Sequence, residues 1–432
     1  MKLWAKDHSA TLEAVEKFTI GRDKEFDLLL AKYDVLGSLA HTEMLVSVGL
    51  LTTDEWESIR QGLQEIQGEI DANRFVIEPG VEDIHSQIEL LLTRRIGEAG
   101  KKIHSGRSRN DQVAVDIKLY LRAELTEIQL LVLELFEQLL QLSEQHKDVL
   151  LPGYTHLQVA MPSSFGLWFG AWAESLVDDL DLLLTAKSLS NKNPLGSGAG
   201  YGSSFPLNRS MTTGLLQFKG MHYNSVYAQM SRGKTEKIVA MAVANLGSTL
   251  ARFSMDICLY LSQNFGFISF PEDLTTGSSI MPHKKNPDIF ELIRAKGNRL
   301  QALPNELSLL LTNLPSGYHR DLQLTKEILF PSLEDLKNCL HMLIYALPHI
   351  SVKQDILSDE RYKYLFSVEA VNELVLQGVS FREAYKTIGN QIEAGHFHWD
   401  ASQPLRHTHE GSIGRLCLEE IRAAMQRVLE RV

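Results

Sequence analysis

Cysteine is scarce in this chain of 432 residues, and long apolar runs are missing. Cys258, Cys339 and Cys417 are odd in number, lie far apart and form no CxxC pair. This spacing argues against a disulfide framework or a cysteine zinc site, and favours reduced thiols in a cytoplasmic protein. No run of about 18 apolar residues occurs, so no membrane span is predicted. The charged start also lacks the apolar stretch of a signal peptide.

Positive charge is in short supply as well. Lys plus Arg number 43 against 54 Asp plus Glu, which gives a formal net charge of −11. Nucleic-acid binding needs clustered cations that face phosphates, so a nucleic-acid partner is not expected. Net charge says little about a small acidic substrate, because such a substrate meets local charge.

Alternating runs of β-branched residues are few, and helical periodicity dominates instead. Residues 107–151 contain no Gly or Pro, and apolar residues step by three or four from Ile117 to Leu142. This spacing predicts one continuous helix, and apolar residues off that stripe predict more than one packing neighbour, as in a bundle or an oligomer core. Other helices are expected from Pro162 at an N1 position, over 234–263, from Pro287, and over 326–347.

These patterns predict an all-α protein in three parts. Residues 1–106 are expected to form a smaller helical N-terminal domain. Residues 107–350 are expected to form a long central helix bundle, and residues 351–432 a small helical C-terminal domain. The chain is long enough for about three domains. Most of its residues would nevertheless belong to one helical core.

The loop at 270–288 combines small residues with cations and precedes a helix. Small residues let backbone N–H groups face a ligand, and a helix N-terminus favours an anion. Lys284, Lys285 and Asn286 add donors, so a carboxylate-binding loop that carries a serine is one interpretation. A solvated turn before an ordinary helix is an equally weighted alternative.

Two more loops carry polar side chains next to predicted helices. The segment 153–158 offers Thr155, His156 and Gln158, although a lone histidine is more often structural than catalytic. The segment 104–112 offers Ser105, Arg109 and Asn110, where planar guanidinium groups would suit a substrate with several carboxylates. The alternative for that segment is a basic, well-capped helix start.

Two further patterns carry weaker hypotheses. The glycines at 196, 198, 200 and 202 do not fit G-x-G-x-x-G, and no βαβ pattern surrounds them, so a tight backbone passage is favoured over a nucleotide site. Histidines at 396, 398, 407 and 409 lie in a polar tail without a completing ligand set, so solvated side chains are favoured over a metal site.

Three separated segments together resemble a known family. GSSIMPHKKNP at 277–287 resembles the signature loop of the fumarase/aspartase superfamily. HSGRSRNDQ at 104–112 and GYTHLQ at 153–158 are similar to the forms found in the argininosuccinate lyase family of that superfamily. Shorter matches extend the resemblance over about residues 26–388, among them EDIH at 82–85.

The resemblance implies a fold and a reaction. The fold is an all-α homotetramer whose long helices form a large bundle, with active sites built from loops of different chains. The reaction is β-elimination of argininosuccinate to arginine and fumarate, the last step of arginine biosynthesis, with no metal and no organic cofactor. A sister lyase with a shifted substrate, or a crystallin-like homologue that has lost activity, are the alternatives.

The resemblance also implies residue roles. Ser278 matches the loop serine usually viewed as the base, His156 matches the histidine with the opposite proton-transfer role, and Glu291 matches the carboxylate that orients it. These two proton-transfer roles can also be assigned in reverse. Lys284, with Asn286, would neutralise the aci-carboxylate intermediate. Substrate-binding positions are matched by Ser105, Arg109, Asn110, Thr155, Gln158, Asn286, Tyr318, Arg320, Gln323 and Lys326.

The sequence departs from the family pattern in three places. The usual Ser-Asp-Arg-Asp segment reads Ser231-Arg232-Gly233, so both aspartates are missing. Near the start Trp4 is not followed by the usual glycines, and Thr19 is the nearest match for a substrate-contacting serine. Arg320 stands where a lysine is usual. These changes concern the amino acid half of the substrate and leave the proton-transfer set intact.

Overall fold

Helices dominate the computed structural model, which describes residues 10–400, 403 and 405–431. Strands in this part of the chain form three two-stranded sheets, so the all-α fold class is confirmed. The α-helices are α1 (Ala10–Ile20), α2 (Asp23–Ser47), α3 (Thr53–Asp71), α4 (Ile84–Ile96), α5 (Glu98–Lys101), α6 (Arg109–Gln145), α7 (Phe165–Ser190), α8 (Arg209–Leu215), α9 (Ser225–Met230), α10 (Lys234–Leu261), α11 (Asp288–Leu300), α12 (Leu303–Leu310), α13 (Leu324–Ala346), α14 (Ser367–Leu376), α15 (Phe381–Glu393) and α16 (Leu418–Glu430).

The remaining elements are short. The strands are β1 (Leu150–Thr155), β2 (Gln158–Ser164), β3 (Lys192–Asn193), β4 (Gly220–Met221), β5 (Ile268–Ser269) and β6 (Ser351–Val352). The 3-10 helices are η1 (Lys102–His104), η2 (Glu272–Leu274), η3 (Arg320–Gln323), η4 (Leu347–His349), η5 (Ile356–Ser358) and η6 (Glu360–Tyr362).

The chain divides into two compact units. Unit 1 comprises Met1–Gln129, Leu182–Asn245 and Arg299–Lys337, and unit 2 comprises Leu130–Asp181, Leu246–Asn298 and Asn338–Val432. The three-part division at residues 106 and 350 stays a prediction.

The predicted apolar stripe lies on α6 and is buried. Ile117, Leu125 and Leu139 belong to this stripe, and each is at most 1% exposed. Residues spaced three and four apart share one face of a helix, so they enter the core together. Leu131 and Leu140, which lie off the stripe, are buried as well. The helix therefore has packing partners on more than one side, as its composition predicts.

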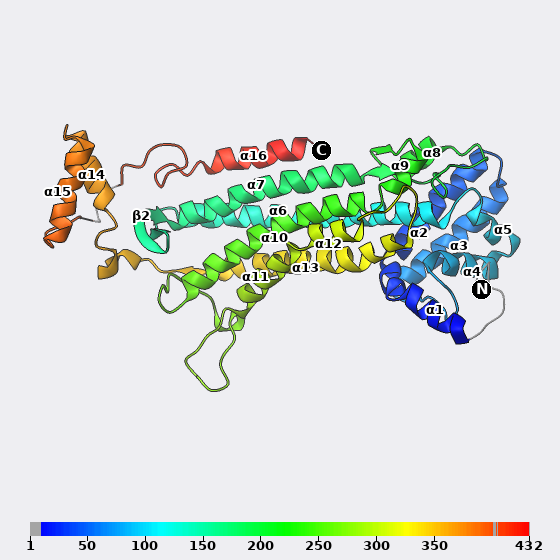
Figure 1. Cartoon of the computed structure of the whole chain (residues 1–432), viewed down its shortest axis with the longest axis horizontal. Coiled ribbons are helices and arrows are strands. Elements are labelled where there is room, and N and C mark those ends of the chain that lie inside the picture. Colours follow the sequence, from blue (N-terminus) through cyan, green and yellow to red (C-terminus); the bar gives the residue numbers. More distant parts are fainter. Residues whose placement is uncertain (1–9, 401–402, 404, 432) are drawn as a thin grey trace. The chain divides into compact units, whose positions relative to one another are not determined.

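Unit 1 contains three helices, α2, α3 and α4, that pack side by side (Figure 1). A capping box opens α3, in which the Thr52 hydroxyl accepts from the Glu55 amide and the Glu55 carboxylate accepts from the Thr52 amide. The Asp83 carboxylate caps α4 by accepting from the Ser86 amide at 2.8 Å. These caps fix where the two helices begin, and the second cap lies next to a predicted site residue.

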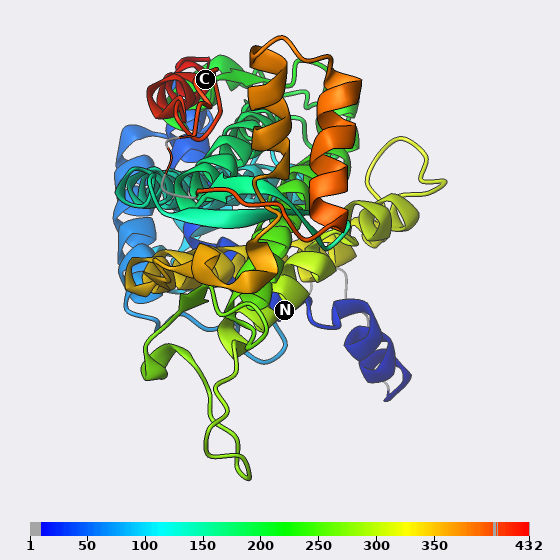
Figure 2. The same ribbon diagram turned by 90° about the vertical axis from the view of Figure 1, so that its left-hand side faces the viewer.

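Unit 2 has an aromatic core and a small helical pair. Trp168 of α7 packs against Phe253 and Tyr260 of α10, with ring centroids 5.6 and 5.1 Å apart. Farther along the chain α14 and α15 lie side by side (Figure 2). They enclose a cluster of buried apolar residues that includes Val371 and Ile388.

The prediction that Pro162 opens a helix is wrong. Pro162 lies in β2 opposite Pro152 of β1, and α7 begins three residues later at Phe165. Neither proline has an amide N–H, so this pair of strands tolerates both of them only where no ladder hydrogen bond is needed. The register shifts between Pro152 and Tyr154, next to the proline pair. The apolar helical spacing after Phe165 therefore predicts α7 correctly, but its start comes later than the proline suggests.

The stretch Ser225–Leu261, which holds α9 and α10, is long and apolar enough to cross a membrane. However, 61% of its most apolar window is buried inside the protein. Val239, Val243 and Leu246 are fully buried in the core. It is therefore a core helix whose composition reflects packing against its neighbours.

Candidate active site

A tight hairpin turn presents the predicted histidine. Thr155 of β1 pairs with Gln158 of β2, so His156 and Leu157 form a two-residue turn with φ of 55° and 57°. Positive φ at both central residues is typical of the turn type that suits a hairpin, but it is unfavourable for side chains larger than glycine. The turn leaves Thr155, His156 and Gln158 exposed. The predicted residues of this segment therefore lie together and face outward.

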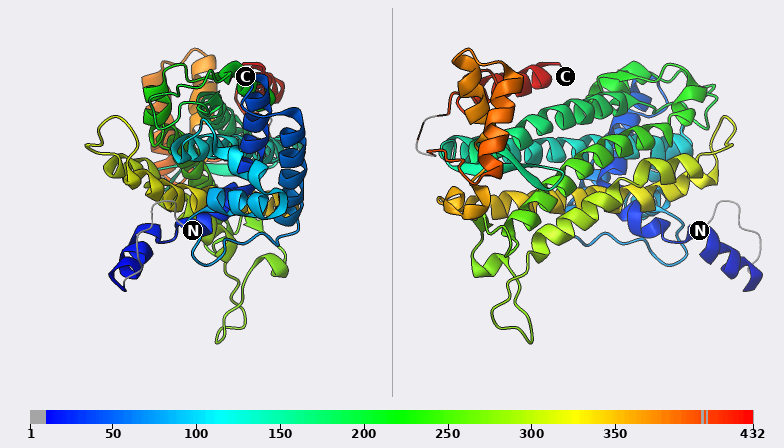
Figure 3. Two further views of the ribbon diagram at one scale, coloured as in Figure 1. Left: turned by 90° about the vertical axis from the view of Figure 1, so that its right-hand side faces the viewer. Right: turned by 60° about the vertical axis from the view of Figure 1, so that its left-hand side comes forward.

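The signature loop (277–287) has a defined neck. The Thr276 amide donates to the Asn286 carbonyl at 3.2 Å, and the Asn286 amide donates to the Thr276 carbonyl at 2.8 Å. The Thr276 hydroxyl also donates to the Asp288 carboxylate at the start of α11. The loop projects away from the helices of unit 2 (Figure 3). The two ends of the loop are thus hydrogen-bonded to each other, and the rest of the loop extends away from the helices.

Inside the loop the Ser278 hydroxyl faces two backbone donors. Its oxygen accepts from the Met281 amide at 3.0 Å and from the Ile280 amide at 3.3 Å. Amide groups that converge on one oxygen stabilise negative charge on it. These two amides would stabilise an alkoxide at Ser278 if the hydroxyl lost its proton.

Lys284, Lys285 and Glu291, the charged residues in and next to the loop, differ in their ion pairs. The Lys285 ammonium pairs with Glu272 at 2.8 Å, whereas Lys284 is exposed and has no ion pair within the described residues. The Glu291 carboxylate lies 3.7 Å from Arg294. Within the described chain neither Glu291 nor Ser278 shares a hydrogen bond with His156. The chain therefore carries these groups without hydrogen bonds between them in its described part.

Unit 1 holds the other predicted residues, beginning with those at the start of α6. Arg109 pairs with the Asp83 carboxylate that caps α4. The Ser105 carbonyl accepts from His41 at 2.8 Å. The Asn110 amide donates to the Ser108 hydroxyl at 3.3 Å. The segment thus has a fixed backbone, and its Ser105 and Asn110 side chains are half-buried.

Asp111 is a buried anchor whose importance was missed by the sequence interpretation. Its carboxylate accepts from the Ser108 amide at 2.8 Å and from the amides of Gly196 and Gly198, both at 2.9 Å. Burial raises the pKa of Asp111 to about 6 despite these donors. Gly196, Gly198, Gly200 and Gly202 all have positive φ, so the predicted tight backbone passage is confirmed, and it is tied to the start of α6.

The segment from Tyr318 to Lys326 is held against the N-terminal helices. The Arg320 guanidinium and the Gln323 amide both donate to the Thr19 carbonyl at 3.1 Å. The Lys326 ammonium is buried between Asp23 at 2.6 Å and Asp27 at 2.5 Å. Tyr318 is exposed. The predicted site residue Lys326 therefore already pairs with two carboxylates. Trp4 lies outside the described residues.

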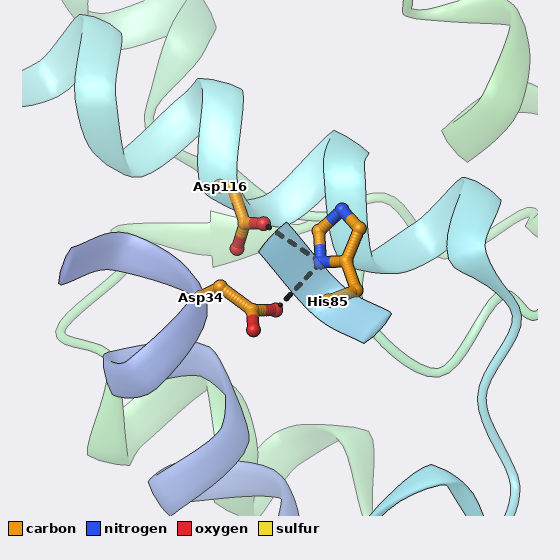
Figure 4. A group of neighbouring side chains, drawn as sticks. All are labelled: Asp34, His85 and Asp116. Carbon is orange, nitrogen blue, oxygen red and sulfur yellow. Dashed lines mark hydrogen bonds and ion pairs between the residues drawn. The ribbon is translucent and has the colours of Figure 1, made fainter. Parts of the chain in front are cut away.

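A buried acid–histidine cluster lies in unit 1 (Figure 4). His85 Nδ1 lies 2.9 Å from Asp34 and 3.8 Å from Asp116, and the candidate ligand atoms of the three residues lie within 4.8 Å of one another. Such spacing could hold a metal ion. However, the Arg107 guanidinium is buried nearby and bonds to Ser38 at 3.1 Å. A protonated imidazole and this guanidinium already supply positive charge beside the two acids, so the cluster needs no further cation.

The titration of His85 agrees with a protonated imidazole in this cluster. Although burial opposes it, Asp34 raises the pKa of His85 to about 9. Burial, and then the charge of Asp34, raise the pKa of Asp116 well above its ordinary value. His85 is therefore expected to be protonated at neutral pH. The histidines at 396, 398, 407 and 409 join no such group within the described chain, and His407 contacts Glu369 at 3.0 Å.

Comparisons with known proteins identify the family of the chain. A family model described as "Lyase" matches residues 8–302. An argininosuccinate lyase of Bacteroides fragilis is 57% identical over 429 residues, which cover 99% of this chain and 95% of that protein. An argininosuccinate lyase of Methylococcus capsulatus is 42% identical over 396 residues, which cover 91% of this chain and 84% of that protein.

Solved structures share the fold. An EDDS lyase variant with bound fumarate has a TM-score of 0.76 at 22% identity, covering 96% of this chain and 89% of that one. A fumarate lyase:delta crystallin from Brucella melitensis has a TM-score of 0.73 at 16% identity, covering 100% of this chain and 97% of that one. At such identities these likenesses concern the fold alone.

The all-α fold and the projecting signature loop define a lyase of the fumarase/aspartase superfamily. The identity and coverage of its relatives are more specific. The chain belongs to the argininosuccinate lyase family.

Proposed function

We propose that the protein catalyses the β-elimination of argininosuccinate to arginine and fumarate, the last step of arginine biosynthesis. The observation that carries this proposal is 57% identity over 99% of the chain to proteins of that name. All three motifs that the chemistry needs are present in the sequence. The three cysteines are free, which suits a cytoplasmic enzyme.

In this reaction Ser278 removes a proton from the carbon next to a carboxylate. That carbon is a weak acid, so the dianionic aci-carboxylate that forms needs fixed positive charge and donors. Lys284 and Asn286 supply them. His156, oriented by Glu291, then protonates the departing guanidino nitrogen. The two amides that donate to Ser278 Oγ favour this assignment over the one with the two roles exchanged.

The remaining predicted side chains hold the substrate. A planar guanidinium or amide group can bind a carboxylate through paired hydrogen bonds. The proposed substrate-binding residues are Ser105, Arg109, Asn110, Thr155, Gln158, Asn286, Tyr318, Arg320, Gln323 and Lys326. No nucleic acid, metal or organic cofactor takes part in the proposed reaction.

Fumarate release tests the function directly. Purified protein mixed with argininosuccinate is expected to produce the ultraviolet absorbance of fumarate. The absence of fumarate at every protein concentration would refute the proposal. Adenylosuccinate, aspartate and malate are tested in the same assay. A sister lyase would release fumarate from one of these compounds and not from argininosuccinate.

We further propose a homotetramer in which active sites combine loops from different chains. Large apolar side chains stay exposed on several helices of a single chain, where a partner chain could cover them. They include Leu130, Leu182, Met241, Met255, Leu292, Leu309 and Tyr345. Sharing of sites would also account for the lack of a hydrogen bond between His156 and Ser278 in the described part of one chain.

Mixing two inactive variants tests this sharing. Ser278→Ala and His156→Gln are each expected to be inactive alone. When they are dissociated and reassembled together, activity is expected to return, because some sites take an intact Ser278 and an intact His156 from different chains. Each variant reassembled with itself is the control. Mixed tetramers that form by native mass spectrometry yet stay inactive would contradict the shared site.

A further inference from the structure

The hairpin that carries His156 has an exposed tip and a buried base. The side chains from Thr155 to Val159 are exposed, whereas Leu151 and Pro152 are buried. His156 and Leu157 both have positive φ, and such a conformation persists only where the surrounding structure imposes it. The direction of the His156 imidazole therefore depends on contacts at the base of the hairpin.

Tyr154 is the half-buried side chain of β1 that comes just before this tip. Its hydroxyl donates to the Tyr362 hydroxyl at 3.3 Å. Its ring meets the Phe265 ring edge to face, with centroids 5.4 Å apart. Burial, and then the hydrogen bond to Tyr362, raise the pKa of Tyr154 above its ordinary value, so this phenol keeps its proton at neutral pH. A residue two positions before His156 is thus bound to Tyr362.

Tyr362 is itself fixed against the core of unit 2. It is buried at the end of η6, and its ring centroid lies 6.3 Å from that of the buried Phe267. The neighbouring Arg361 guanidinium donates to the Asn264 carbonyl at 3.1 Å. The Phe267 carbonyl accepts from the Lys353 amide at 2.9 Å. The segment around Tyr362 therefore gives the hairpin a rigid support.

The proposed reaction is sensitive to the position of the His156 imidazole. A proton passes between two groups when their heavy atoms come within about 2.6 to 3.2 Å of each other. A misplacement of about 1 Å can lower a rate by about 100-fold. A hairpin with an exposed tip can tilt about its base, so a contact that limits this tilt also limits the position of the imidazole.

We propose that Tyr362 is a positioning residue for the reaction, because it contacts Tyr154 at the base of the hairpin and so holds His156 in the direction that proton transfer needs. This inference rests on the proposed function, which gives His156 its role. Tyr362 lies 208 residues after Tyr154 and outside the three motifs that carry the family resemblance. It adds a C-terminal segment to the candidate site and acts on the reaction through Tyr154.

Steady-state kinetics of full-length variants on argininosuccinate test the inference, with rates normalised to the folded oligomer measured by sedimentation. Tyr362→Leu keeps an apolar side chain but removes the phenol. It is expected to lower kcat and kcat/KM together by about 10- to 100-fold. Tyr362→Phe keeps the ring and loses only the hydrogen bond, so it is expected to lower kcat by about two- to tenfold. KM is expected to stay within about threefold in both variants.

A double-mutant cycle shows whether the two hydroxyls act together. Tyr154→Phe is expected to lower kcat by about two- to tenfold, like Tyr362→Phe. The variant with both changes is expected to lose no more than the more affected single variant, because both changes remove the same hydrogen bond. Losses that multiply would mean that the two hydroxyls act separately and would overturn the inference.

Tyr364→Phe is the matched control. Tyr364 lies two residues after Tyr362, but its ring packs against Phe397, with centroids 6.0 Å apart. This variant is expected to keep kcat within about twofold of the wild type. A loss in Tyr364→Phe equal to that in Tyr362→Phe would mean that the effect is one of general packing, and the positioning role would be wrong.

Hydrogen exchange followed by mass spectrometry measures the support of the hairpin without turnover. In Tyr362→Leu, peptides from β1 and β2 are expected to exchange about tenfold faster than in the wild type, while peptides from α3 in unit 1 keep their rates. Unchanged exchange in the hairpin, or faster exchange with unchanged kcat, would overturn the inference. If Tyr362→Leu does not fold, Tyr362→Phe and the double-mutant cycle decide the matter.

The same measurements separate this inference from the proposed function. A wild type that releases no fumarate would refute the proposed function, and the exchange rates would still decide whether Tyr362 supports the hairpin. A wild type that releases fumarate, together with a Tyr362→Leu variant of unchanged kcat, would refute the positioning role alone.

Discussion

Replacement of Ser278 by alanine is expected to lower kcat on argininosuccinate by about three to four orders of magnitude. The hydroxyl is the proposed base, and its oxygen already accepts from the amides of Ile280 and Met281. Alanine removes the only atom that could take the proton there, while the loop keeps the neck between Thr276 and Asn286. Because the binding groups stay, KM is expected to change by much less than kcat.

The neighbouring serine provides the control for this variant. Ser279 is exposed and lies in the same loop, so Ser279→Ala perturbs the backbone to a similar extent. It is expected to keep activity within about tenfold of the wild type. Sedimentation should give the same oligomer for both variants. If Ser278→Ala retains activity comparable to that of Ser279→Ala, the base is another group, and the reversed assignment with His156 becomes the better hypothesis.

The helical part of the fold could be predicted because its signal is periodic. The stripe from Ile117 to Leu142 has the spacing of one helix face. That face is buried, as the spacing predicts. The hairpin of β1 and β2 has no comparable signal. Its strands contain Pro152 and Pro162, and its turn uses His156 and Leu157 instead of the glycine or asparagine that would mark it.

The motifs of the candidate site can be recognised from the sequence, but the charge network of unit 1 cannot. Ser278 lies in a segment of small residues before a helix, which can be recognised from the sequence. Asp23 and Lys326 are about 300 residues apart along the chain and meet at 2.6 Å. His85 similarly joins α2, α4 and α6. Pairing between distant ionisable groups depends on packing, and a single sequence carries no periodic signal for it.

Replacement of His85 by glutamine is expected to remove much of the pH dependence of stability between neutral and alkaline pH. The pKa of His85 is raised from its ordinary 6.5 to about 9 in the folded protein. The folded state therefore holds a proton between these values that the unfolded state has released. A group with a raised folded pKa stabilises the protein fully below its unfolded pKa, and this contribution is lost as the pH rises through 9. The loss amounts to about 3 kcal/mol, since one pKa unit corresponds to about 1.4 kcal/mol.

The measurement is the free energy of unfolding in denaturant at several pH values and one protein concentration. At pH 7 the glutamine variant is expected to be about 3 to 5 kcal/mol less stable than the wild type, because the buried Asp34 carboxylate loses its imidazolium partner. That difference is expected to shrink by about 2 kcal/mol between pH 7 and pH 9, and by the rest above pH 9. Groups that titrate identically in both proteins cancel in the difference. Parallel curves for the two proteins would mean that His85 is neutral, and the charge balance assigned to Asp34, Asp116 and Arg107 would then be wrong.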